Sequence, residues 1–174
     1  MKNLYQLIPD QGQREAAIID LKFARKILGK LVSGDENVDP TLVVYIGFLL
    51  FGFVELSKTD KKATYKMDAI NALSRDYHER AMLHCKKKAE VEKMPLEKQK
   101  VEREKIDLKY AQALMQDWIK NKKVNPNDAM YIGYLTHNLF FQKTHIPIQQ
   151  LATNERIEHL SIFFHEKALL DREK

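Results

Sequence analysis

The chain has little cysteine, glycine or proline: its 174 residues include one Cys, six Gly and five Pro. Because Cys85 is the only cysteine, no internal disulfide can form, and we expect a reducing compartment, the cytoplasm. β-Rich proteins of this size use more Gly and Pro in their turns, so their scarcity favours helices. The first residues lack the apolar core and cleavage site of a secretory signal.

Long hydrophobic runs are missing as well. The longest uncharged apolar stretch, Thr41–Val54, is shorter than the ~20 apolar residues of a membrane helix, so we expect no membrane span. A hydrophobic fraction of 44% and a charged fraction of 30% are typical of a globular protein. A chain of this length buries enough surface to fold without a disulfide or a structural metal.

Catalytic motifs are also lacking. We find no Gly-rich phosphate loop, nucleophile elbow or dinucleotide fingerprint. The His-Glu-x-x-His zinc pattern fails, because Met82 and Leu169 stand four residues after His78 and His165. We therefore expect no catalytic residues, no metal and no cofactor.

Positive charge is in modest excess, with a net charge of +5 and a pI of about 9.1. Much of it lies in the segment 86–105, which opens with Lys86, Lys87 and Lys88. Acidic residues alternate with the basic ones there, which is typical of a solvated helix surface. Binding to nucleic acid remains an alternative that the charge alone supports.

The sequence does contain an internal repeat, with an offset of 86 or 87 residues. The same blocks occur twice in the same order, which is the signature of a duplicated structural unit. The matched blocks are Ile19–Ala24 with Ile106–Ala111, Tyr45–Leu49 with Tyr131–Leu135, and His78–Ala81 with His165–Ala168.

Each copy predicts three helices. Helical spacing of apolar residues indicates the first, over 13–32 and 96–120. The second begins where Asp39 or Asn125 caps a helix and is followed by proline. The third carries one apolar stripe, and in the first copy we expect it to continue to about Lys93.

The predicted fold is therefore all-α, with six main helices formed by tandem duplication of a three-helix unit into a pseudo-twofold bundle. The repeats span 9–88 and 89–174, joined into one compact unit by a charged helical connector near 86–105. Gly47 and Gly133 match within the second helices. Because Gly costs a helix about 1 kcal/mol relative to Ala, we expect another helix to approach closely there.

Carboxylates stand on the apolar faces of both first helices, at Asp20 and Asp107. Buried carboxylates need partners, and candidate partners are also duplicated. We favour a buried polar network that fixes the helix register over a pair of proton-transferring or metal-binding sites. The members of this network are Asp20, Tyr45, His78, Asp107, Tyr131 and His165.

The two copies differ in the second helix, where the first has apolar residues and the second is more polar. This difference predicts that the polar face meets water, a ligand or another protein. The candidate partner-binding residues are Thr136, His137, Asn138, Lys86, Lys87 and Lys88.

Three functions fit these observations. We favour a non-enzymatic protein–protein interaction module, an adaptor, regulator or inhibitor that uses a helical face or the groove between the repeats. The alternatives are a nucleic-acid-associated basic helical protein, and an enzyme or metal-binding protein using the duplicated Asp/His/Tyr sets. A homodimer is also compatible with an incompletely covered helical core.

Overall fold

The computed structural model describes all residues, 1–174, and contains eight α-helices. The all-α prediction is confirmed. Six helices are long: α2 (Gln11–Val32), α3 (Pro40–Ser57), α4 (Met67–His84), α6 (Leu96–Asn121), α7 (Pro126–Thr144) and α8 (Asn154–Arg172). The short elements are α1 (Leu4–Leu7), α5 (Lys88–Glu92), a 3-10 turn (Ile148–Gln150) and the strands β1 (Lys2–Asn3) and β2 (Lys123–Val124). The two strands pair antiparallel, with Lys2 opposite Val124.

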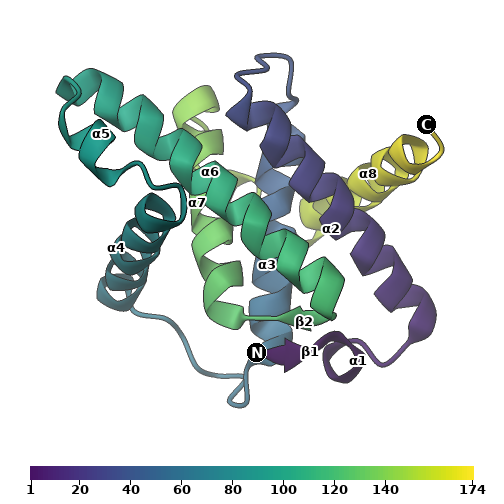
Figure 1. Ribbon diagram of the computed structural model, residues 1–174. Helices are drawn as coiled ribbons and strands as arrows, with labels where there is room; N and C mark the ends of the chain where they lie inside the picture. The colour runs from purple at the N-terminus through teal and green to yellow at the C-terminus, as the bar shows by residue number, and fades with distance from the viewer.

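The helix pair α3 and α7 forms the centre of the molecule (Figure 1). Both begin where the sequence predicts: Asp39 accepts a hydrogen bond from the Thr41 amide at 2.9 Å, and Asn125 accepts one from the Asn127 amide at 3.0 Å. These caps satisfy amides that have no partner within the helix. Local capping therefore determines where the central pair starts.

The close approach expected at the two matched glycines is confirmed. A Cβ added to Gly47 would lie 2.1 Å from Cδ2 of His137, and one added to Gly133 would lie 2.9 Å from Cε1 of Phe51. A side chain at either position therefore collides with an aromatic ring of the opposite helix. Glycine at these two positions lets α3 and α7 pack tightly.

Helix α3 is also the one helix long and apolar enough to cross a membrane by length and composition, with a mean hydropathy of 1.8 over its 18 residues. It is longer than the uncharged stretch seen in the sequence, because it includes Glu55. In this structure it packs against α7 and α8. The core helix of a soluble protein passes the same test.

The other four long helices surround the central pair. In Figure 1, α4 and α8 lie on opposite sides, while α2 and α6 cross in front. Helix α2 packs against α6 and α8, and α4 packs against α6 and α7. The last helix thus docks on the first long helix, far away in sequence.

The expected continuation of the third helix to Lys93 is wrong, since α4 ends at His84. Lys86 adopts a left-handed backbone conformation with φ of 54°, and the Lys87 amide donates to the Met82 carbonyl at 3.2 Å. This bond belongs to a helix-ending motif that usually contains glycine. The chain turns back, and α5 places Val91, fully buried, near Met82. The free energy gained by burying Val91 offsets the cost of the left-handed backbone conformation at Lys86.

Candidate functional site

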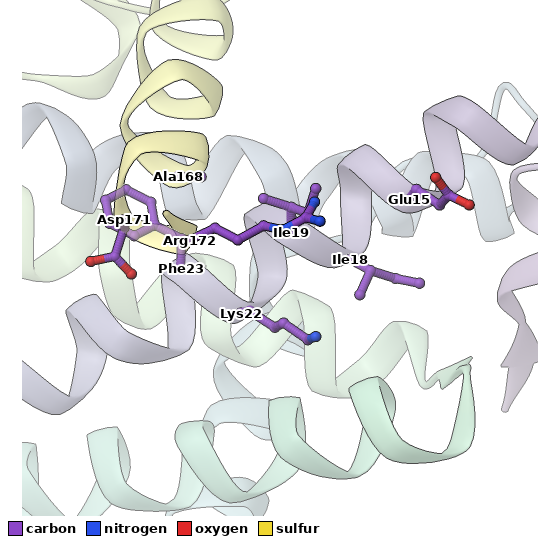
Figure 2. Close-up of a pocket in the computed structure, with 8 residues that line it drawn as sticks. All are labelled: Glu15, Ile18, Ile19, Lys22, Phe23, Ala168, Asp171 and Arg172. Carbon is purple, nitrogen blue, oxygen red and sulfur yellow. The ribbon is translucent and has the colours of Figure 1, made fainter. Parts of the chain in front are cut away.

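A cavity of about 490 Å³ lies between α2 and α8 (Figure 2). We call it the α2/α8 groove. Its lining combines apolar and charged side chains in equal number, so it is more polar than a typical site for a small organic ligand. The apolar members are Ile18, Ile19, Phe23 and Ala168, and the charged members are Glu15, Lys22, Asp171 and Arg172.

Helical spacing brings these side chains to one face. On α2 the lining positions recur every three or four residues, from Glu15 through Lys22 and Phe23. Phe23 packs edge-to-face on Phe164 of α8, with ring centroids 5.1 Å apart. Ala168 has a small side chain, which leaves room between the two helices. The groove is thus formed by packing of helices that are far apart in sequence.

Ion pairing at the rim is confined to one bridge. Lys26 Nζ lies 2.5 Å from Asp171 Oδ1, and the lysine side chain is half exposed. Exposed pairs of this kind contribute about 0–1 kcal/mol, so the bridge does little to close the groove. The remaining rim charges, on Glu15, Lys22 and Arg172, are of both signs.

An aspartate–histidine pair holds α2 and α8 together. His165 Nδ1 lies 2.8 Å from Asp20 Oδ1, and the carboxyl is buried. Burial raises the pKa of Asp20, whereas the hydrogen bond to His165 opposes that rise. The pair satisfies a carboxylate that would otherwise be costly on an apolar helix face.

A second aspartate–histidine pair joins α4 to α6. His78 Nδ1 lies 3.0 Å from both carboxylate oxygens of Asp107, and the Tyr131 hydroxyl donates to Asp107 Oδ1 at 2.6 Å. Burial raises the pKa of Tyr131, which keeps its hydroxyl a donor. The Tyr45 hydroxyl behaves differently, because it donates to Ser161 Oγ at 2.7 Å and not to Asp20. Five of the six residues expected to form a network therefore form two separate pairs, one of them with Tyr131 attached, and Tyr45 bonds to neither pair.

A smaller cavity of about 320 Å³ borders the second pair. His78 and Asp107 line it together with Asn138, one of the residues expected to bind a partner. Lys100 and Arg103 of α6 also line it. Side chains of both signs therefore surround this cavity.

The residues of the polar face on α7 differ in burial. Thr136 is fully buried, and its hydroxyl donates to the Ile132 carbonyl of its own helix at 3.0 Å. The His137 ring packs against Phe48 and Phe51 of α3 with its Nε2 buried and unbonded. The central helix pair thus covers Thr136, whereas His137 is half-buried and lines a cavity of about 360 Å³ together with Asn138.

Burial lowers the pKa of His137 to about 4, so its ring is neutral near pH 7. Asn138 alone of the three is exposed.

The three lysines of the connector are largely engaged. Lys87 pairs with Glu90 at 2.5 Å and Lys88 with Glu79 at 3.0 Å, while Lys86 is exposed at the turn. Acidic partners therefore neutralise much of this basic cluster.

Sequence reasoning missed a third buried carboxylate, Asp128. It accepts a hydrogen bond from the Tyr77 hydroxyl at 2.5 Å and another from Trp118 Nε1 at 3.2 Å. Burial raises the pKa of Asp128. Its position in the first turn of α7 resembles an ordinary helix-start acid. The available signal was a sequence comparison, because the acid at 128 aligns with the apolar Leu42, 86 positions earlier.

No group of three or more His, Cys, Asp or Glu side chains is arranged to hold a metal ion. Comparisons with protein-family models, with curated proteins and with solved structures found no match. The fold thus defines the class as all-α, and the candidate functional features are the α2/α8 groove and the aspartate–histidine pairs.

Proposed function

We propose that the protein is a non-enzymatic interaction module that binds another protein in the α2/α8 groove, as an adaptor, regulator or inhibitor. The observation that carries this proposal is the cavity of about 490 Å³ with an apolar lining and a charged rim. Ile18, Ile19 and Phe23 are only half-buried there, so a partner could cover them. Docking of a helix on such a groove requires no catalytic motif.

The same proposal includes a tandem duplication with pseudo-twofold symmetry, which places the groove between the repeats. Equivalent contacts support it. The Asp20–His165 pair corresponds to the Asp107–His78 pair, with each joining one repeat to the other. The His137 ring of α7 packs on Gly47 of α3, and the Phe51 ring of α3 packs on Gly133 of α7, so the two helices exchange equivalent contacts. Symmetric exchange of contacts is what a fused dimer of identical units would make.

The test compares two matched variants in affinity capture from the source cells. Ile19→Glu places a charge in the groove, whereas Ile162→Glu places the same charge on an exposed residue of α8 that does not line it. We expect one protein to be captured by the wild type and by Ile162→Glu but lost from Ile19→Glu. Circular dichroism melts would establish that both variants fold. Equal capture by both variants would contradict the proposal.

The same captures distinguish the nucleic-acid alternative. Binding through phosphate contacts falls steeply with salt. Recovery of nucleic acid alone, lost at high salt, would replace the protein-binding proposal. The pairing of Lys87 and Lys88 with glutamates weighs against that result.

One observation favours a second candidate, a small-ligand site with acid–base chemistry. His78 is oriented by Asp107, and both residues line the cavity of about 320 Å³ beside Lys100 and Arg103. Titration of small carboxylates and inorganic phosphate, monitored through the imidazole NMR signals, tests it. Selective shifts of His78, with His165 as the internal control, would support this site. Equal or absent shifts would leave both pairs with a structural role.

A further inference from the structure

The α2/α8 groove has a counterpart in the other half of the molecule, between α4 and α6. There Ala81, Met82 and Ile106 form a small buried cluster with Val91 of α5. Val91 is fully buried, so the five-residue helix α5 covers this surface. The counterpart of the groove is therefore occupied by a segment of the same chain.

The side chains that meet in the two places match. In the repeat alignment Ile19 corresponds to Ile106, and Ala168 to Ala81. The next residue along α8, Leu169, corresponds to Met82 of α4. Met82 is 3% exposed beneath α5, whereas Leu169 is 38% exposed. Much of the apolar surface is thus present in both halves, although Arg172 stands where Cys85 packs on the first cluster, and no segment of residues 1–174 covers the surface beside α8.

Helix α5 also shows which chemistry fits the surface. Lys88 stands three residues before Val91, on the same side of the helix, and its Nζ lies 3.0 Å from Glu79 Oε2. Glu79 corresponds to Glu166 on α8, which is exposed. The uncovered surface therefore offers both an apolar contact and an acid at the position that receives a lysine in the other half.

We propose that the α2/α8 groove binds a short amphipathic helix of a partner protein, with Val, Ile or Leu inserted and a lysine three residues before it. The apolar side chain takes the place that Val91 takes between α4 and α6, and the lysine pairs with Glu166. This inference rests on the proposed function, because it specifies the partner of the same groove.

Selection from a library of helical peptides tests it. A displayed library of about twelve residues, long enough for three turns, is selected on the full chain. Peptides that also bind the Ile19→Glu variant are then removed, and peptides that still bind the Ile162→Glu variant are kept. We expect enrichment of Lys-x-x-Val, Lys-x-x-Ile or Lys-x-x-Leu. Changing the apolar residue to Ala should weaken binding about tenfold, and changing the lysine to Ala about threefold.

A charge exchange identifies the proposed ion pair. Glu166→Lys should weaken the selected peptide, and a peptide with Glu in place of its lysine should recover binding to that variant. Groove-dependent peptides without the pattern would overturn this inference and leave the proposed function standing. Absence of any groove-dependent peptide would overturn both. A dimer of the protein alone, dissociated by Ile19→Glu in sedimentation experiments, would place a second copy in the groove and also overturn the inference.

Discussion

Replacement of His137 by phenylalanine should remove much of the acid sensitivity of this fold. The His137 ring packs on Gly47 between the rings of Phe48 and Phe51, and its Nε2 has no hydrogen-bond partner. Phenylalanine already makes the same kind of contact on the facing helix, where Phe51 packs on Gly133. His137→Phe therefore keeps a ring in the α3/α7 interface and removes the titrating group.

The magnitude follows from the pKa. Burial lowers the pKa of His137 from its ordinary value of 6.5 to about 4. Between these values the unfolded chain binds the proton and the folded chain does not, so stability is full above pH 6.5 and falls as the pH drops to 4. At about 1.4 kcal/mol per pKa unit, the loss is roughly 3 kcal/mol.

Urea unfolding at pH 7 and pH 4 measures it. At pH 7 we expect the variant to lie within about 1.5 kcal/mol of the wild type, since the ring is nearly conserved and an unbonded nitrogen is removed. The free energy of unfolding of the variant minus that of the wild type should be roughly 3 kcal/mol larger at pH 4 than at pH 7. Burial raises the pKa of Asp20, Glu104 and Asp128, which changes stability with the opposite sign, but these groups are common to both proteins.

Near-identical pH dependence in the two proteins would refute the reasoning. It would mean that the His137 ring is hydrated or leaves the α3/α7 interface when protonated, without cost to the fold. The imidazole signals of His137 provide an independent check, because they should not titrate near pH 6.5 in the folded protein.

Three further predictions concern stability. Gly47→Ala should lower the stability by about 1–3 kcal/mol, because the added methyl group collides with His137. Gly52→Ala in the same helix has open space around it and should raise the stability by up to about 1 kcal/mol. Thermal melts of both variants test this, and equal effects would contradict the close packing at Gly47. Asp128→Ala should lower the stability by about 1–3 kcal/mol and shift the Trp118 fluorescence, because the buried donors of Tyr77 and Trp118 lose their acceptor. An unchanged spectrum and an unchanged melt would argue against these hydrogen bonds. Val91→Ala should cost about 1–2 kcal/mol and speed amide exchange in α5, and unaltered exchange would show that α5 does not depend on this contact.

Local signals in the sequence predict the helices well where a few neighbouring residues decide the backbone. The caps at Asp39 and Asn125 start α3 and α7 because a side-chain oxygen satisfies an amide two residues away. Gly47 and Gly133 indicate a close approach, since a helix retains glycine at a cost. The end of α4 was missed because Lys86 adopts a conformation that its residue type does not favour, and the burial of Val91 against Ile106 of α6 supports it.

The composition and periodicity of this chain by themselves determined an all-α fold with six long helices, because capping and the apolar stripe act within one helix. Tertiary structure alone decided which helices exchange contacts, and so paired Asp20 with His165 across 145 residues of sequence. It also turned His137 into the α3/α7 interface and opened the α2/α8 groove. The orientation of a side chain relative to another helix depends on how the two helices dock, and no residue encodes that docking locally.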